Sequence, residues 1–321
     1  MSDTVKKYLK MVLPIALGVF LVWYLYNSTT AEQRQEILSH IKNADPLWVF
    51  ISIAIGFLSH LSRAIRWNYL LEPLGYKPKL SNNLFIILTA YLTNLGIPRS
   101  GEFLRATALA TYEGVPFEKG FGTIVSERIV DVIMLLLIIV IALVLQTDLI
   151  LEFISESGLG IIGGVVILLV GVLGTFILIR LIKKSTSSFA IKIKNFLKSL
   201  LDGVLSIYKM KHKWAFIFHT LFIWVAYIAM FWVIKFTVFE TADLSLSALL
   251  VAFVGGAFAM TTTNGGLIAY PAAVSKSLEI FGISVVAGNA FGWIMWISQT
   301  IMVIVFGAIS FLLLPLFNRN K

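Results

Sequence analysis

The sequence contains no cysteine, and charged residues make up only 13% of its 321 positions. The first absence excludes disulfides, catalytic thiols and cysteine-based metal sites, but it leaves the cellular compartment open. The second excludes a typical soluble composition, because hydrophobic residues reach 58% and the mean hydropathy is +0.89. Little polar sequence remains from which a soluble catalytic domain could be built.

Several motifs with a known chemical mechanism are also missing. The sequence has no H-E-x-x-H zinc motif, no G-x-S-x-G nucleophile motif and no nucleotide-binding P-loop. Any transport by this chain is therefore expected to be passive or ion-coupled rather than driven by ATP bound to it. No cofactor and no metal are predicted.

Long apolar runs dominate what is present. Each is long enough to cross the hydrocarbon core of a bilayer as a helix, and together they predict an all-α, polytopic membrane protein. The runs are 11–26, 47–61, 132–145, 159–182, 214–239 and 291–317. Lysines precede the first run, but it is long for a secretory signal and no A-x-A cleavage site follows it. An uncleaved signal-anchor helix is therefore predicted there.

The net charge of +9 could suggest nucleic acid, but lysine and arginine gather at the ends of apolar runs. We therefore expect these charges to set topology and to attract anionic lipid. The positive-inside rule predicts that both termini are cytoplasmic. The protein is expected in the cell membrane, as a multi-pass protein of a bacterial inner membrane. The N-terminus, 63–80, 180–213 and the C-terminus are assigned to the cytoplasm, and 28–46, 148–158 and 240–247 to the outside.

This topology forces two apolar runs to re-enter the membrane without crossing it. The chain is inside at Lys79 and outside at Asp148, yet 84–97 and 124–145 are both apolar. Only the second can cross, so the first is predicted to form a re-entrant hairpin that turns in "NLGIPRSGEFLR". The second half of the chain is similar, because it is outside at Asp243 and inside at the C-terminus, yet 246–263 and 291–314 are both apolar. One of these runs is therefore predicted to form a second hairpin, which enters from the outside and turns in "TTTNGGLIAYP".

Hairpins from opposite faces are typical of an inverted repeat, and the spacing of the two halves is similar. The predicted fold is about six spanning helices plus two re-entrant helical hairpins in one membrane domain, 1–321. Two unrelated hairpins with similar spacing are the alternative. The predicted parts are a signal-anchor helix with an outer segment (1–46), a first repeat half (47–147), a linking helix (148–182), a basic amphipathic cytoplasmic segment (183–213) and a second repeat half (214–317).

Non-helical backbone at membrane depth needs a polar cavity or surrounding protein, so the hairpin tips are predicted to line a substrate site. Helix N-termini favour anions, and Ser100 is predicted to cap the returning leg of the first hairpin. Ionisable residues, which are costly in lipid, gather nearby. The candidate substrate-binding residues are Arg63, Arg66, Trp67, Ser100, Gly101, Glu102, Arg105, Glu127, Arg128, Asp131, Asn264, Gly265 and Gly266.

A structural role is the alternative for these charges. They could form salt bridges that lock the hairpin to a neighbouring helix, with Arg63 and Arg66 extending to the cytoplasmic edge. His60 shares a helical face with Arg63, whereas His219 is interpreted as a core histidine.

The stretches "RAIRW", "GIPRSGEFLR" and "SERIVD", in this order, resemble the lysylphosphatidylglycerol synthase transmembrane family, also called the flippase-like domain family. The resemblance implies a membrane protein that moves lipids or lipid-linked sugars. The second half departs from the family pattern, because Asn264 replaces a proline and no acid lies near Tyr270. A soluble aminoacyl-transfer domain is not expected, so the chain is predicted not to be an enzyme.

Three functions remain open at this point. The first is a flippase or scramblase that moves the headgroup of an anionic phospholipid or of a polyprenyl-phosphate-linked sugar, with Glu102, Glu127 and Asp131 as proton carriers. The second is an embedded enzyme acting on a lipid phosphate, with Glu102 or Glu127 as base and His60 as acid. The third is a non-transporting assembly subunit. Membrane lipids are the predicted partners, nucleic acid is not, and the oligomeric state stays open.

Overall fold

The computed structural model describes residues 30–97, 100–147, 187, 191, 210–263 and 265–319, and all regular structure in these ranges is helical. The chain divides into two compact units, which are described separately below: Met1–Val125 with Lys211–Lys321, and Ser126–Met210. The apolar runs 11–26 and 159–182, most of the basic segment 183–213, and Asn264 lie outside the described residues.

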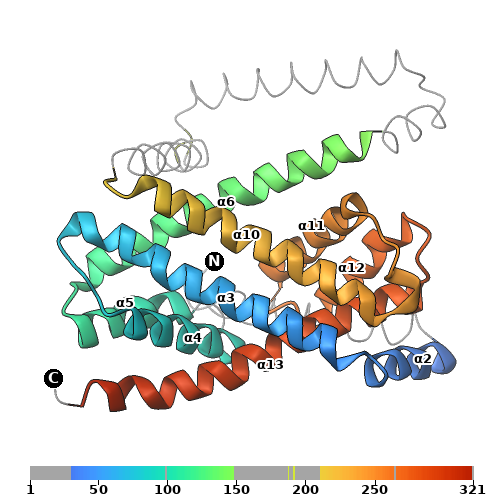
Figure 1. Cartoon of the computed structure of the whole chain (residues 1–321), viewed down its shortest axis with the longest axis horizontal. Coiled ribbons are helices and arrows are strands. Elements are labelled where there is room, and N and C mark those ends of the chain that lie inside the picture. The colour runs from blue at the N-terminus through green and yellow to red at the C-terminus, as the bar shows by residue number, and fades with distance from the viewer. Residues whose placement is uncertain are drawn as a thin grey trace. The chain divides into compact units, whose positions relative to one another are not determined.

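The helices follow one another in two series with similar lengths (Figure 1). The first series is α2 (Ala31–Lys42), α3 (Pro46–Leu71), η1 (Glu72–Leu74), α4 (Leu80–Gly96), α5 (Ser100–Glu113) and α6 (Phe117–Leu145). The second series is α10 (Lys213–Ile234), η2 (Lys235–Thr237), η3 (Phe239–Thr241), α11 (Leu246–Thr262), α12 (Ala269–Glu279) and α13 (Val285–Phe317).

Four of the described helical segments are long and apolar enough to cross a membrane: Pro46–Leu74, Phe117–Leu145, Lys213–Thr237 and Val285–Phe317. The helices between them are shorter. α4 and α11 have 17 residues each, α5 has 14 and α12 has 11. A helix of 17 residues is about 25 Å long, which is less than the roughly 30 Å hydrocarbon core. The chain is therefore a multi-pass helical membrane protein.

Local sequence signals explain where several helices begin. Asp45 caps α3 by accepting a hydrogen bond from the Leu47 amide at 2.9 Å, and Pro46 occupies the first helical position. Ser245 and Ser284 cap α11 and α13 in the same way. These caps satisfy backbone amides that have no partner within their own helix.

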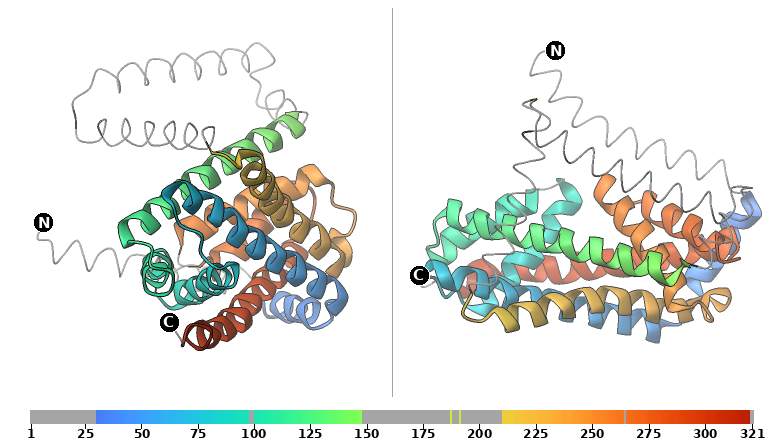
Figure 2. Two further views of the ribbon diagram at one scale, coloured as in Figure 1. Left: turned by 60° about the vertical axis from the view of Figure 1, so that its left-hand side comes forward. Right: turned by 90° about the horizontal axis from the view of Figure 1, so that it is seen from above.

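α3 and α10 form an antiparallel pair along their length. At one end His212 Nδ1 lies 2.7 Å from a carboxylate oxygen of Glu72, and at the other the rings of Trp48 and Phe236 are 4.7 Å apart. α3 lies between α10 and α13 in Figure 1 and in the left panel of Figure 2. The side chains that face this interface are buried, so α3 forms part of the core of the first unit.

Glycines allow close approach of the hairpin helices. A Cβ atom on Gly101 would lie 2.3 Å from the Ala90 carbonyl oxygen, so α5 packs directly on the α4 backbone. A Cβ atom on Gly307 of α13 would lie 2.9 Å from the Leu88 carbonyl oxygen of α4. Contacts between helices that depend on small residues are common in membrane proteins, where close van der Waals packing replaces a hydrophobic driving force.

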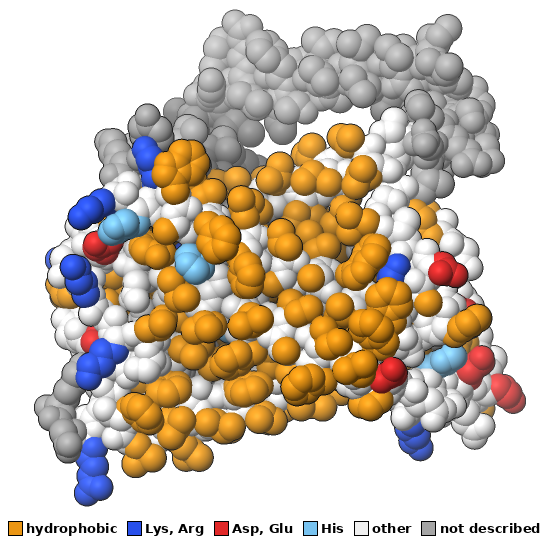
Figure 3. All heavy atoms as spheres, in the orientation of Figure 1, with side chains coloured by type: hydrophobic (Ala, Val, Ile, Leu, Met, Phe, Trp, Pro, Cys, Tyr) orange, Lys and Arg blue, Asp and Glu red, His pale blue; other side chains and the backbone are white. Residues whose placement is uncertain are grey.

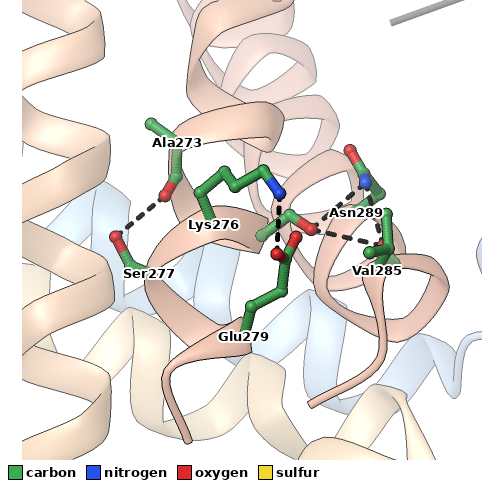
Figure 4. A network of polar contacts seen from close by, with 7 residues as sticks. Ala273, Lys276, Ser277, Glu279, Val285 and Asn289 are labelled. Atoms are coloured by element: carbon green, nitrogen blue, oxygen red, sulfur yellow. Dashed lines mark hydrogen bonds and ion pairs between the residues drawn. The ribbon is translucent and has the colours of Figure 1, made fainter. Parts of the chain in front are cut away.

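Polar contacts join α12 to α13 (Figure 4). The Asn289 amide donates to the Ser275 hydroxyl at 3.2 Å and to the Val285 carbonyl at 2.9 Å, while the Ser275 hydroxyl donates to the same carbonyl at 3.2 Å. Lys276 forms an exposed ion pair with Glu279 at 2.7 Å. Buried and partly buried hydrogen bonds thus join the two helices beside the turn, and the ion pair is exposed.

One face of the first unit shows how its side chains are distributed (Figure 3). Apolar side chains cover a broad band across the middle of the helices, and charged side chains gather at the two ends of that band. Strongly exposed apolar residues also occur on α10, for example Phe218 and Val225. An apolar band between two charged ends is the arrangement expected of a surface that faces lipid.

Candidate functional site

Two arginines lie one turn apart on α3 and are buried against α10. Arg63 is 2% exposed and donates from Nη2 to the Tyr227 hydroxyl at 3.1 Å. Arg66 is fully buried, donates from Nη1 to the Thr220 hydroxyl at 3.2 Å, and lies 5.7 Å from the centre of the Phe216 ring. Both guanidinium groups therefore lie in the protein interior, in contact with side chains of α10.

A third arginine joins this region from the returning leg of the first hairpin. Arg105 of α5 is 3% exposed, and its guanidinium carbon lies 4.2 Å from the centre of the Trp67 ring. The Trp67 indole is fully buried and donates to the Thr123 hydroxyl at 2.9 Å. Trp67 follows Arg66 directly and lies one turn after Arg63, so the three arginines gather around the second half of α3.

The donor groups of these arginines suit a site for a negatively charged group. The contacts named above are made to hydroxyl groups and aromatic rings, and all three arginines make further interactions besides these. A guanidinium presents several donors in a fixed plane that matches phosphate or carboxylate oxygens. The cluster formed by Arg63, Arg66 and Arg105 is called the arginine cluster below.

The break between α4 and α5 differs in detail from the expectation. Ser100 was predicted to cap α5, but it is the first residue of that helix, and its hydroxyl donates to the Ile97 carbonyl at 2.7 Å and to the Thr93 carbonyl at 3.3 Å. The Asn94 side chain instead accepts the hydrogen bond of the Gly101 amide at 2.8 Å. The prediction for Ser100 was wrong because Ser100 is already the first residue of α5, whereas a cap precedes the first helical residue.

Glu102 follows Gly101 in the first turn of α5 and is partly exposed. A carboxylate in the first turn of a helix is favourable because it lies near the positive end of the helix dipole. Glu102 therefore has a local reason for its place, in addition to the predicted role in a substrate site.

The second unit holds the charges of "SERIVD" on α6. Glu127 is fully buried, and its carboxylate lies 3.6 Å from the Arg128 guanidinium. Arg128 also lies 3.7 Å from the carboxylate of Asp131, one turn further along the helix. These distances describe a local charge network within one helix, with Arg128 half exposed between the two acids.

The second break, between α11 and α12, is built on glycine backbone. Gly265 and Gly266 have φ angles of 70° and 67°, which are strained for other residues. The Gly265 carbonyl accepts a hydrogen bond from the Trp296 indole at 2.8 Å, and the Gly266 carbonyl accepts one from the Tyr270 amide at 2.9 Å. This turn is thus fastened to α13 and α12 through backbone oxygens.

Two histidines of the first unit differ in their surroundings. His219 of α10 lies 2.8 Å from the Ser62 hydroxyl through Nδ1, so it has a hydrogen-bond partner, but it is only partly buried and does not lie in the core. His60 of α3 is 7% exposed and packs on Tyr91 of α4 with ring centres 4.8 Å apart. Its Nδ1 atom is buried and has no hydrogen-bond partner in the described part of the chain.

Metal-dependent chemistry has no obvious ligand set in this region. No group of three or more His, Cys, Asp or Glu side chains among the described residues is arranged to hold a metal ion. The arginine cluster and the glycine turn are the two groups of candidate residues whose surroundings the structure describes in the first unit.

The sequence model of the lysylphosphatidylglycerol synthase TM region matches residues 11–312. The chain belongs to this family. The match includes both series of helices and all thirteen candidate residues named from the sequence, so the resemblance based on "RAIRW", "GIPRSGEFLR" and "SERIVD" is confirmed.

The chain also matches curated proteins, in each case over less than half of that protein's length. The protein named glycosyltransferase AglD of Haloferax volcanii is 32% identical over 102 residues, which is 30% of this chain and 16% of that protein. A UPF0104 membrane protein of Methanocaldococcus jannaschii is 27% identical over 99 residues, 30% of each chain. A UPF0104 membrane protein of Methanothermobacter thermautotrophicus is 24% identical over 135 residues, 41% of this chain and 37% of that protein. No solved structure matches the chain.

In this family member, the structure brings together some of the sequence-derived candidates and adds others. Arg63, Arg66, Trp67 and Arg105 gather in one region of the first unit, and Gly265 and Gly266 form a separate turn. No sequence pattern selects Thr123, Thr220 or Tyr227, whose hydroxyl groups accept hydrogen bonds in and beside the cluster. Hydroxyl side chains are common on apolar helices. Only the packing of helices that are far apart in the sequence shows which of these hydroxyl groups lie next to an arginine.

Proposed function

We propose that the protein is a lipid transporter of the flippase or scramblase type, which moves an anionic phospholipid or a polyprenyl-phosphate-linked sugar across the membrane. The observation that carries this proposal is the arginine cluster. Three guanidinium groups are buried in the first unit at 0–3% exposure, next to hydroxyl groups and an indole ring. Buried charges in membrane proteins are costly and commonly mark the path of a charged substrate.

The chemistry of the cluster favours a phosphate over a neutral or cationic headgroup. A phosphate offers several acceptor oxygens to the planar donors of Arg63, Arg66 and Arg105. Hydrogen bonds to charged groups contribute about 1.5–3 kcal/mol each when both partners are desolvated. The acyl or polyprenyl chains would stay in the lipid while the headgroup occupies the cluster, so only the polar part needs a path through the protein.

The order of the helices supports the predicted inverted repeat. A long helix, two short helices and another long helix follow one another as α3 to α6, with 26, 17, 14 and 29 residues, and as α10 to α13, with 22, 17, 11 and 33. In the proposed topology the short pairs α4–α5 and α11–α12 are re-entrant hairpins from opposite faces. Six helices cross the bilayer of the cell membrane, with both termini in the cytoplasm. Broken helices that meet near the midplane are a common way to build a transport site.

The proposal also includes the substrate-binding residues predicted from the sequence that lie outside the arginine cluster. Glu102 on the first tip, and Glu127, Arg128 and Asp131 on α6, remain proposed substrate-binding residues. Asn264, Gly265 and Gly266 would form the second tip. Partners other than membrane lipids are not proposed.

The name of one relative gives a specific reason to keep an enzyme as the second candidate. AglD is named a glycosyltransferase, but the matched region is 16% of its length. That name favours a lipid-linked sugar as one substrate to test. In the enzyme alternative, Glu102 or Glu127 would act as general base on the lipid phosphate.

Reconstitution distinguishes the candidates. Purified protein is placed in liposomes with fluorescent phosphatidylglycerol, or with a polyprenyl-phosphate sugar, in one leaflet. Both the leaflet of the label and its chemical identity are then followed. Transport predicts that the label reaches the other leaflet unchanged, whereas an embedded enzyme predicts a modified lipid. If the label stays in its leaflet and is unchanged for both lipids, the transporter proposal is wrong.

A further inference from the structure

A tryptophan of α10 carries a buried hydrogen-bond donor that has no acceptor. Trp224 is 8% exposed, and its indole Nε1 atom has no hydrogen-bond partner in the part of the chain that the structure describes. An indole N–H group can only donate, so it needs an acceptor from elsewhere. A buried donor without an acceptor costs free energy, and each such group in a native protein calls for an explanation.

His60 of α3 is a second buried side chain with an unsatisfied nitrogen. It is 7% exposed and packs on Tyr91 of α4, and its Nδ1 atom also lacks a hydrogen-bond partner among the described residues. An imidazole nitrogen donates or accepts, depending on the tautomer. Together the two side chains offer one obligate donor and one nitrogen of either kind.

The two side chains lie at the same level of the antiparallel α3–α10 pair. The register of this pair is fixed by the contacts at its two ends, Trp48 with Phe236 and Glu72 with His212. His60 is about midway along α3 between these contacts, and Trp224 is about midway along α10, because both helices rise by the same amount per residue. The contact of 2.8 Å between Ser62 and His219 agrees with this register to within about one turn.

The same level is crossed by the contact between Arg63 and Tyr227. Arg63 follows His60 by one turn on α3, and Tyr227 follows Trp224 by one turn on α10, where the two ring centres are 5.9 Å apart. Because the helices are antiparallel, the hydrogen bond from the Arg63 guanidinium to the Tyr227 hydroxyl spans the level of the two unsatisfied nitrogens. Both nitrogens therefore belong to the region between α3 and α10 in which the arginine cluster lies.

We propose that Trp224 and His60 bind hydroxyl groups of the transported headgroup, and that they thereby select lipids whose headgroup carries hydroxyls. A hydroxyl oxygen accepts a hydrogen bond from the indole N–H group, and a hydroxyl donates to or accepts from the imidazole nitrogen in either tautomer. The glycerol of phosphatidylglycerol and the sugar of a lipid-linked saccharide share this chemistry. The inference rests on the proposed function, which brings a headgroup into this region, and it does not depend on which groups hold the phosphate.

The expected selectivity follows from the unsatisfied nitrogens. A site whose buried groups bind a hydroxyl rejects the analogue that lacks it, because those groups stay unpaired when the analogue is bound. One hydrogen bond between uncharged groups changes affinity by about fivefold. Two such bonds therefore predict a preference of about fivefold to thirtyfold for the hydroxyl-bearing lipid.

Competition between matched lipids tests the inference. The full chain in detergent is equilibrated with equal amounts of phosphatidylglycerol and phosphatidylethanol, and the lipid that it retains is counted by native mass spectrometry. Both lipids carry one phosphodiester charge, but only the first has headgroup hydroxyls. A second pair is a polyprenyl-phosphate glucose and the ethyl phosphodiester of the same polyprenyl phosphate. The wild-type protein should prefer the hydroxyl-bearing member by about fivefold or more in at least one pair, and that pair identifies the source of the hydroxyls.

Single substitutions connect the preference to the two side chains. Trp224→Phe keeps an aromatic ring near Phe253, whose ring centre lies 6.3 Å from that of Trp224, but it removes the donor and should lower the preference to about twofold or less. His60→Phe keeps a ring on Tyr91 and should also lower the preference. Trp214→Phe is the matched control, because Trp214 belongs to the same helix and is 75% exposed, and it should keep the wild-type preference. Each result is a ratio of two lipids, so a general loss of affinity does not change it.

The outcomes distinguish the inference from the function on which it rests. If the wild-type protein binds both members of each pair equally, the inference is wrong while anionic-lipid binding stands. It is also wrong if Trp224→Phe retains the wild-type preference, since a buried water molecule then suffices for the indole. If the protein binds none of the four lipids, the proposed function fails and the inference fails with it. When Trp224→Phe does not fold, His60→Phe decides, because an unchanged preference in that variant contradicts the inference.

Discussion

The hydrogen bond between the Trp67 indole and the Thr123 hydroxyl leads to a quantitative prediction. The indole is fully buried and the donor–acceptor distance is 2.9 Å, so loss of the hydroxyl leaves an N–H group without its acceptor in the core. Such a loss costs about 1–3 kcal/mol. Thr123→Val, which retains shape but removes the acceptor, should therefore lower the free energy of unfolding by that amount.

The effect on function should exceed the effect expected from stability alone. Trp67 also supports the Arg105 guanidinium at 4.2 Å, a cation–π contact of about 2 kcal/mol in a desolvated setting. An indole that rotates to find another acceptor would displace Arg105. We therefore expect Thr123→Val to weaken phosphatidylglycerol binding in the folded fraction, while Thr123→Ser retains both stability and binding.

A double-mutant cycle in detergent measures the contact directly. Trp67→Phe removes the donor, so Thr123→Val should cost about 1 kcal/mol less in the Trp67→Phe background than in the wild type. Unfolding is followed by chemical denaturation of the same preparations. The reasoning is refuted if Thr123→Val has the stability of the wild type, or if its cost is the same in both backgrounds.

Two further predictions concern the first hairpin. Gly101→Ala should destabilise the protein by about 1–3 kcal/mol or more, because the new Cβ atom would lie 2.3 Å from the Ala90 carbonyl oxygen. Gly96→Ala is the matched control and should have little effect on the melting temperature, since nothing lies within 4 Å of its Cβ position; equal melting temperatures for the two variants would contradict the packing. Single cysteines introduced at Gly75 and Glu118 of this cysteine-free chain should react with a membrane-impermeant thiol reagent from the same, cytoplasmic side. Labelling from opposite sides would exclude the re-entrant hairpin.

Much of the helical architecture could be predicted from the sequence, for identifiable reasons. The apolar run 47–61 lies within α3, whose start is marked by Asp45 and Pro46, and 84–97 corresponds closely to α4. Helix breaks near Gly96 and Gly265 were predicted because glycine and proline interrupt otherwise apolar runs. The length of an apolar run and the helix-breaking effect of glycine and proline depend only on neighbouring residues. Helix positions can therefore be predicted from them without knowledge of how the helices pack.

The partners of the charged residues could not be predicted in the same way. Arg63 meets Tyr227 and Arg66 meets Thr220, more than 150 residues away along the chain. These pairings depend on how α3 packs on α10, and no local pattern specifies it. The sequence could therefore select the arginines by the cost of burying charge, while their hydroxyl partners required the structure.

The wrong prediction for Ser100 has a related cause. Serine at the start of a helix can cap it or can donate backwards to a preceding turn, and composition does not distinguish the two. The α4–α5 contact places the Ile97 and Thr93 carbonyls within reach of its hydroxyl, and Asn94 takes the Gly101 amide. The contact between α4 and α5 therefore decided which side chain accepts the hydrogen bond of the Gly101 amide.

The central claim is that the arginine cluster binds the headgroup of a transported anionic lipid, and translocation by arginine variants tests it most directly. Arg63→Gln and Arg105→Gln are reconstituted with fluorescent phosphatidylglycerol, and the melting temperature of each preparation is measured alongside. Removal of one charged hydrogen-bond donor should slow translocation by about tenfold or more. Arg105→Lys retains the charge over Trp67 and should lie between the wild type and Arg105→Gln. A stably folded variant that moves the lipid at the wild-type rate would show that these arginines are structural, and it would contradict the account.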